Sequence, residues 1–226
     1  MRKILVLTLI LFGSQILQAQ LSTVIGKTDY PFWVNVPVQK VMDGKVPIIL
    51  FLHGKSLSGT DINRVKRYGI LRAIEKGRQI PALVIAPQLA SGAWNPDKVL
   101  EVLKYVQKNY KTDLSRVYVC GMSMGGYGTM HFAGKYPQRI TAAVAICGGG
   151  NEKDACRLGN IPLWIQHGDR DFVVPISESK KIVKAIKFCN PKADVKFTII
   201  PGGNHSNVEN LFREDAIYDW MLKQKK

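Results

Sequence analysis

The segment Gly121–Gly125 reads Gly-Met-Ser-Met-Gly and directly follows the apolar run Val117–Cys120. A nucleophilic serine needs a sharp turn between a strand and a helix, where a strained backbone with φ above zero holds the hydroxyl clear of the sheet. Side chains two residues before and after the serine would crowd this turn, and glycine occupies both places. The pattern therefore predicts that Ser123 is a nucleophile.

A serine hydroxyl becomes reactive when a neighbouring base, normally a histidine oriented by a carboxylate, takes its proton. His205 follows the apolar run Val195–Ile200 across a Pro-Gly-Gly-Asn loop, and Asp171 follows the run that ends at Gln166. The chain order serine, aspartate, histidine is that of one particular fold class. We therefore predict a catalytic triad of Ser123, Asp171 and His205.

Other residues compete for these roles. Asp169 lies two residues before Asp171 and is the alternative acid, although Asp171 is favoured. His205 taken alone would be read as a surface loop residue. His167 is interpreted as a structural residue at a strand end, and His131 as a packed or exposed residue of the helix after the serine.

Main-chain donors for an oxyanion are expected directly after the nucleophile and in the loop after an early strand. We predict the backbone N–H groups of Met124 and Lys55, the second in the loop His53–Ser56. The same loop contains Gly-Lys-Ser, the end of a phosphate-binding motif, but the first glycine of that motif would fall at Ile49 inside a strand. The match fails, and no cofactor or metal is predicted.

Strand-like and helix-like segments alternate along the chain and place each of these residues at the end of a strand. The expected strands are 32–36, 46–52, 82–86, 117–120, 141–147, 161–166 and 195–200, and the expected helices are 61–77, 96–110, 123–135, 177–188 and 208–222. Apolar strands in this alternation predict an α/β fold, a mostly parallel sheet with helices on both faces. Ligands bind beyond the carboxyl ends of such strands.

The N-terminus has the composition of an export signal, because Arg2 and Lys3 precede the apolar run Ile4–Phe12 and the small residue Ala19 lies near the expected cut. We predict a signal peptide at residues 1–20 and a single catalytic domain at 21–226, secreted or periplasmic. The apolar run is short for a membrane span, so no stable span is predicted, and an uncleaved anchor is the alternative.

The formal net charge of +15 favours anionic surroundings. The basic residues are scattered along predicted helix faces, which favours solvated surfaces over a specific polyanion site. No nucleic-acid-binding motif accompanies the charge, so nucleic acid is not a predicted partner.

Export would allow the four cysteines to oxidise. Cys120 precedes the nucleophile in its strand and is predicted to be a buried free thiol. Cys147 and Cys156 flank a glycine-rich loop and form the preferred pair, with Cys156–Cys189 as the other pairing considered. A C-x-x-C pattern, which would indicate a redox or zinc site, is absent.

Together these residues resemble the α/β-hydrolase superfamily over about residues 45–222. Within it, the chain looks like the small secreted esterases of the phospholipase/carboxylesterase and feruloyl-esterase-like group. It is also similar to compact peptidases that share the prolyl-oligopeptidase catalytic domain. The resemblance rests on the segments Phe51–Gly54, Gly121–Gly128, His167–Pro175 and Gly203–His205.

Candidate substrate contacts follow in part from this resemblance. Gln88, with Trp94 after it, belongs to a segment that resembles one near the site of this group. Trp94, Tyr127 and Phe172 are aromatic candidates for contact with a sugar or phenolic group, and core packing is the alternative for each.

Two departures from related hydrolases and one short segment restrict the reactions and substrates that we expect. Dienelactone hydrolases of similar size use a cysteine nucleophile, whereas position 123 is serine, and the loop after Gly54 lacks the H-G-G-G run of some lipases. The segment 148–160 is too short for a multi-helix lid, which favours soluble esters or esters on a polymer.

We therefore predict an exported serine esterase that cleaves carboxylic esters of small molecules or polysaccharides, with acetyl and feruloyl esters as candidates. The alternatives are a serine peptidase of the prolyl-oligopeptidase type and a non-catalytic basic envelope protein that binds polyanions.

Overall fold

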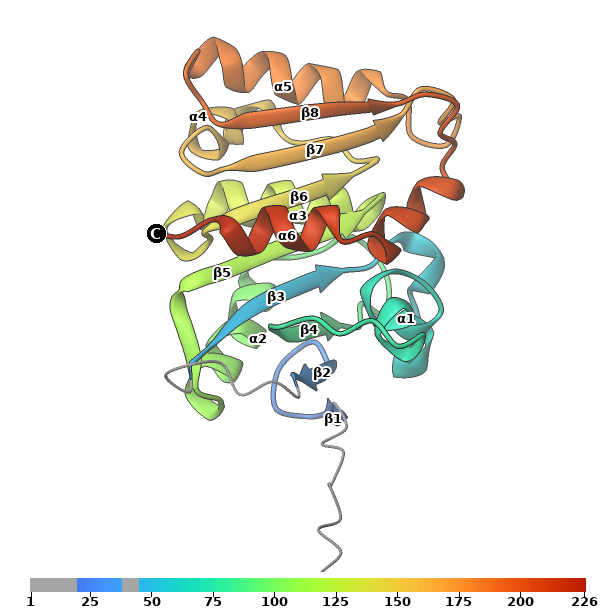
Figure 1. The fold of residues 1–226 in the computed structure, drawn as a ribbon, viewed down its shortest axis with the longest axis vertical. Helices are drawn as coiled ribbons and strands as arrows, with labels where there is room; N and C mark the ends of the chain where they lie inside the picture. Colours follow the sequence, from blue (N-terminus) through green and yellow to red (C-terminus); the bar gives the residue numbers. More distant parts are fainter. Residues whose placement is uncertain (1–19, 38–44) are drawn as a thin grey trace, which may run out of the picture.

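The computed structural model describes residues 20–37 and 45–226. Within these ranges, eight strands form one sheet in the order β1-β2-β4-β3-β5-β6-β7-β8 (Figure 1). The strand β2 is antiparallel to both of its neighbours, whereas the strands from β3 to β8 pair in parallel. The predicted α/β-hydrolase fold, with its mostly parallel sheet, is confirmed.

The strands are β1 (Gln20–Val24), β2 (Phe32–Val36), β3 (Val46–Leu52), β4 (Leu83–Pro87), β5 (Thr112–Met122), β6 (Ala142–Ile146), β7 (Leu163–Gly168) and β8 (Val195–Ile200). The α-helices are α1 (Gly69–Glu75), α2 (Pro96–Asn109), α3 (Met124–Lys135), α4 (Ala155–Leu158), α5 (Ser177–Cys189) and α6 (Ala216–Lys223). The short 3₁₀ helices include η2 (Lys55–Leu57), η3 (Ile62–Lys66), η5 (Glu152–Asp154) and η6 (Asn207–Arg213).

Two apolar layers cover the sheet, one on each face. In β3, Ile48, Leu50 and Leu52 pack in the layer that also holds α2, α3, α4 and α5. Ile49 and Phe51 point the other way and pack in the layer with α1, η6 and α6. In Figure 1, α6 lies in front of the sheet and α3 behind it. Because both faces are covered, the central strands are continuous apolar runs.

Two predicted helices are each interrupted. The segment 61–77 divides into η3 and α1, because Gly69 takes a left-handed φ of 71°. A Cβ at Gly69 would lie 2.2 Å from the ring of Phe51, so the close approach also requires glycine. The segment 208–222 divides into η6 and α6, with an extended Glu214 between them. Apolar residues three or four apart fit both kinds of helix, so periodicity alone did not separate them.

The predicted signal peptide lies outside the described residues, apart from Gln20, which begins β1. The sequence analysis did not predict β1. This five-residue strand forms through antiparallel pairing with β2, which its own sequence does not specify. In the part of the chain that the structure describes, no helix has both the length and the hydropathy that a bilayer crossing requires. The lysines of α5 (Lys180, Lys181, Lys184 and Lys187) are all exposed.

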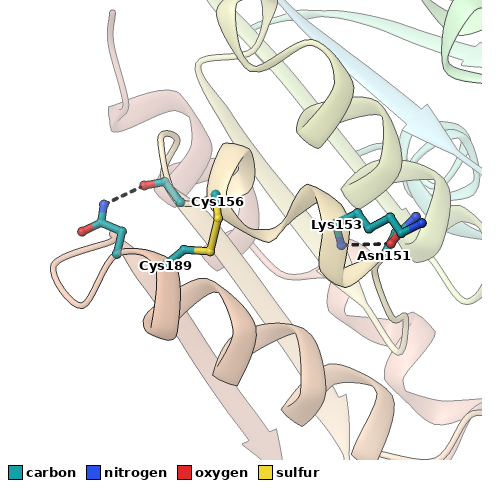
Figure 2. Close-up of a disulfide and its surroundings, with 6 residues drawn as sticks. Asn151, Lys153, Cys156 and Cys189 are labelled. Carbon is teal, nitrogen blue, oxygen red and sulfur yellow. Dashed lines mark hydrogen bonds between the residues drawn. A yellow bond between two sulfur atoms is a disulfide. The ribbon is translucent and has the colours of Figure 1, made fainter.

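The disulfide joins Cys156 to Cys189, so the preferred pairing of Cys147 with Cys156 is wrong. Figure 2 shows the bond between α4 and the C-terminal end of α5. Cys147 follows β6 directly and is buried as a free thiol in the apolar layer of α1, η6 and α6, whereas α4 and α5 belong to the other layer. Cys120 is also a buried free thiol, as predicted.

We expect the variant with both Cys156→Ser and Cys189→Ser to lose stability. The two cysteines are separated by 33 residues. Removing the cross-link between them increases the chain entropy of the unfolded state, and this lowers the free energy of unfolding by about 3–4 kcal/mol. Urea unfolding of the two proteins measures the difference. Reductant should destabilise the wild type and leave the double variant unchanged, and equal stabilities under oxidising conditions would contradict the prediction.

Candidate active site

Ser123 stands between β5 and α3 in a strained turn. Its φ is 58° and its ψ is −124°, the positive φ expected for this position. The Ser123 N–H donates to the Ile146 carbonyl at 2.8 Å, which ties the turn to the neighbouring strand β6. A Cβ at Gly125 would lie 1.8 Å from the Leu52 carbonyl oxygen, so no larger residue fits there. The glycine predicted to relieve crowding therefore does so against the main chain of β3.

Ser123, His205 and Asp171 form a continuous hydrogen-bonded chain at the carboxyl ends of β5, β8 and β7. The distance from His205 Nε2 to Ser123 Oγ is 3.0 Å, and that from His205 Nδ1 to Asp171 Oδ2 is 2.7 Å. The side chain of His205 is 19% exposed and that of Asp171 is fully buried. The imidazole can therefore take a proton from the serine while the carboxylate remains shielded from water.

The surroundings of Asp171 favour its charged form. Burial by itself raises the pKa of this carboxyl, but hydrogen bonds from His205, the Val174 N–H and the Cys147 thiol outweigh it, and the pKa is lowered. The other oxygen, Oδ1, accepts from the Val173 and Val174 N–H groups, each at 2.9 Å. Both oxygens are thus fixed before any substrate binds.

The competing residues lie elsewhere. Asp169 is exposed and its Oδ1 accepts from the Gly202 N–H at 2.8 Å, so it braces the loop after β8 and does not contact His205. His131 is exposed on α3. The structure thus brings together the three favoured side chains and leaves the alternatives out.

The loop after β3 holds one peptide group in a defined orientation. His53 Nδ1 lies 2.8 Å from the Gly54 carbonyl oxygen, and the Leu57 N–H donates to the same oxygen at 3.1 Å. A trans peptide directs its carbonyl and its N–H oppositely. The Lys55 N–H of this peptide group therefore points away from both donors, and Lys55 lines the same cleft as Ser123.

Gln88 and Trp94 do not line the cleft, so their interpretation as substrate contacts is corrected. Both are buried beneath the loop after β3. The Gln88 side-chain amide donates to the Leu57 and Gly59 carbonyls at 2.9 and 2.7 Å. The Trp94 ring N–H donates to the His53 carbonyl at 3.0 Å. Because they hold this loop in place, they are supports for the site.

Tyr127 and Phe172 do not line the cleft either. The Tyr127 hydroxyl lies 3.3 Å from Glu178 Oε2 on α5, and burial, with the charge of Glu178, raises its pKa to about 12. Phe172 is 93% exposed on the loop that carries Asp171. Its neighbour Val173 does line the cleft, so the loop contributes to the wall through that residue.

The cleft beside Ser123 has a volume of about 440 Å³. No residue of the segment 148–160 lines it, in agreement with the absence of a large lid. Its wall includes three aromatic residues that the sequence analysis missed, Phe51, Tyr68 and Phe212. The full lining is Phe51, Gly54, Lys55, Ser56, Leu57, Tyr68, Gly69, Met122, Ser123, Val173, His205, Ser206, Glu209 and Phe212.

Comparison with known proteins agrees with this fold and site. Residues 85–217, more than half of the chain, match the dienelactone hydrolase family. The chain belongs to the dienelactone hydrolase family. Membership makes it a hydrolase of the α/β-hydrolase fold, as the resemblance predicted.

Among individual relatives of this dienelactone hydrolase family member, a bifunctional acetylxylan esterase/xylanase of Neocallimastix patriciarum is 30% identical over 126 residues, which cover 54% of the chain and 17% of that protein. A thermostable esterase of known structure is 27% identical, with a TM-score of 0.75 over 92% of the chain and 64% of the esterase. A feruloyl esterase module from Clostridium thermocellum shares the fold, with a TM-score of 0.68, 15% identity and coverage of 92% and 91%. The chain thus spans less than two thirds of the first two proteins.

In this member of the dienelactone hydrolase family, a buried cluster braces the loop that carries Asp171. His167 Nε2 lies 2.9 Å from the Val174 carbonyl oxygen and His167 Nδ1 lies 2.7 Å from Ser179 Oγ. Cys147, His167 and Asp171 offer ligand atoms within 4.8 Å of one another. Both ring nitrogens of His167 are already hydrogen-bonded, so the cluster positions the acid loop.

Acid should destabilise the protein through His53. Its Nε2 accepts from the Leu89 N–H at 3.0 Å and its Nδ1 donates to Gly54, so the ring is neutral. Burial lowers its pKa from 6.5 to about 4. Between these values the unfolded chain binds a proton that the folded protein does not, so the free energy of unfolding falls as the pH falls through this window, by about 3 kcal/mol in all.

Urea unfolding at a series of pH values measures this loss. Asp171 does not account for it, because a carboxyl with a lowered pKa loses its contribution only below about pH 4. The variant His53→Gln should lack this part of the slope. An equal slope in the variant would contradict the assignment.

Proposed function

We propose that the chain is an exported serine esterase that cleaves carboxylic esters through an acyl-enzyme, with Ser123, His205 and Asp171 as the catalytic groups. The observation that carries the proposal is the pair of hydrogen bonds of His205, 3.0 Å to Ser123 Oγ and 2.7 Å to Asp171 Oδ2. Family membership supports the reaction class.

In the proposed mechanism, Ser123 Oγ attacks the ester carbonyl carbon as His205 Nε2 takes the hydroxyl proton. Asp171 accepts from His205 Nδ1–H, keeps the ring in the required tautomer and stabilises the imidazolium. The imidazolium then gives its proton to the departing alcohol oxygen. A water molecule, deprotonated in turn by His205, attacks the acyl-enzyme and releases the acid.

The negative oxygen of each tetrahedral intermediate would be held by the backbone N–H groups of Met124 and Lys55. Met124 is the first residue of α3, and the N–H groups of a first helical turn have no partner within the helix. The held Gly54 carbonyl directs the Lys55 N–H away from its own supports. Both donors are main-chain atoms that need no reorganisation during the reaction.

The remaining parts of the proposal concern export and substrate. We propose residues 1–20 as a cleaved signal peptide and residues 21–226 as one catalytic domain in the periplasm or outside the cell. The similarity to an acetylxylan esterase/xylanase supports acetyl or feruloyl esters on polysaccharide as substrates, and the cleft wall does not exclude small esters.

The proposal is tested with the purified protein, a fluorophosphonate probe and a panel of acetyl, longer acyl, feruloyl and peptide substrates. We expect the esters to be hydrolysed and the probe to label the peptide that contains Ser123, as located by mass spectrometry. Preferential cleavage of the peptides would support a peptidase instead. A folded protein that neither reacts with the probe nor cleaves any ester would support a non-catalytic binder.

A further inference from the structure

The cleft beside Ser123 contains one acidic side chain in a largely apolar wall. Among the described residues that line the cleft, Glu209 is the one carboxylate. Phe51, Leu57 and Phe212 are buried and apolar, and Tyr68 is half-exposed at the cleft. Placing a carboxylate among such neighbours costs free energy unless the group is hydrogen-bonded. The position of Glu209 therefore requires an explanation.

The local helix directs Glu209 into the cleft. Ser206, Glu209 and Phe212 recur at intervals of three along η6 and its N-terminal cap, and all three line the cleft. Side chains three residues apart lie directly above one another on a 3₁₀ helix. They therefore form one row, which continues from His205 along the same wall.

Glu209 is fixed by two protein partners, but its carboxylate can accept further hydrogen bonds. Its Oε1 accepts from the Gly69 N–H at 2.8 Å, and its Oε2 lies 3.3 Å from Arg213 Nη2, a long contact at the protein surface. The side chain is only 13% exposed. A carboxylate offers about four acceptor sites. Two protein partners therefore leave acceptor capacity on a group that lines the cleft.

We propose that Glu209 is a specificity-determining residue that accepts a hydrogen bond from a hydroxyl group of the bound ester; this rests on the proposed function. The acceptor selects hydroxyl-bearing esters. An analogue without the hydroxyl leaves the desolvated carboxylate short of a partner. The hydroxyl comes either from the acyl group, as a phenol, or from the alcohol, as a sugar.

Two pairs of esters distinguish these sources. Methyl 4-hydroxycinnamate and methyl cinnamate differ only by a phenol on the acyl side, and 1-glyceryl acetate and propyl acetate differ only by hydroxyls on the alcohol side. For at least one pair, we expect wild-type kcat/KM to be about tenfold or more higher for the hydroxylated ester, as for a hydrogen bond to a charged group. The pair that shows the preference identifies the source.

The variant Glu209→Gln keeps an acceptor for the Gly69 N–H and removes the charge. We expect it to lower the preference by about tenfold. Any general effect on the wall acts on both members of a pair and cancels in the ratio. Glu214→Gln, at an exposed position just after η6 that does not line the cleft, is the matched control and should leave the ratio unchanged.

An unchanged ratio in Glu209→Gln, with all esters still hydrolysed, would overturn the role of Glu209 and leave the proposed function intact. A wild-type enzyme that hydrolyses both members of each pair equally would also overturn it. A wild-type protein that hydrolyses none of these esters would instead contradict the proposed function.

Discussion

Replacement of Ser123 by alanine is expected to lower kcat by about 10⁶-fold, close to the loss of the whole triad. The reason is geometric: Oγ is the atom that lies 3.0 Å from His205 Nε2, and no other hydroxyl is hydrogen-bonded to that nitrogen in the described residues. Binding through the cleft wall should persist, so KM should change little. Steady-state kinetics on the preferred ester measures the effect.

The fold of the Ser123→Ala variant should be retained. Alanine carries the same Cβ as serine in the strained turn, so the backbone cost at a φ of 58° is unchanged. Thermal unfolding should therefore give the same Tm within a few degrees. Turnover within tenfold of the wild type would contradict the assignment of the nucleophile, as would fluorophosphonate labelling that persists in the variant.

The parts of the fold that could be predicted are those specified by local pattern. The strands β3, β4, β6 and β7, and the part of β5 from Val117 to Gly121, are buried on both faces, and this makes them short apolar runs in the sequence. The first part of β5, Thr112–Arg116, is only partly buried and was not predicted as strand. Because the strands are parallel, the residues that follow them gather at one edge of the sheet. The prediction that Ser123, Asp171 and His205 lie together depended on this topology, and the structure brings them together.

Features that depend on packing between distant segments could not be predicted. The pairing of Cys156 with Cys189 requires α4 to lie beside the end of α5 (Figure 2), and nothing in the spacing of the cysteines specifies that contact. The support of the loop after β3 by Gln88 and Trp94 is of the same kind. Their segment resembled one near the site, but the sequence alone does not distinguish residues that contact substrate from residues that contact this loop.

The position of Glu209 in the cleft depends on a residue spacing that is present in the sequence but fits two kinds of helix. The segment 208–222 was interpreted as one α-helix, and with 3.6 residues per turn Glu209 and Phe212 do not lie directly above one another. In the 3₁₀ helix η6 they form a single row. The functional interpretation of Glu209 therefore depended on the type of helix, which the spacing of apolar residues does not resolve.

Replacement of Asp171 by asparagine is expected to lower kcat by about 10⁴-fold. An amide can still accept from the Val173 and Val174 N–H groups with its oxygen, so the loop should keep its shape. Its NH₂ group would then face His205 Nδ1 and donate to it. This favours the tautomer that carries its proton on Nε2, which cannot take the proton of Ser123.

Asp169→Asn is the matched control, because Asp169 belongs to the same loop and its side chain accepts a hydrogen bond from the Gly202 N–H instead of contacting His205. Its kcat should stay within about threefold of the wild type, as expected for an exposed substitution away from the reacting groups. Equal losses in both variants would indicate a general effect on the loop. A large loss confined to Asp169→Asn would transfer the acid role from Asp171 to Asp169 and would require the loop to rearrange when substrate binds.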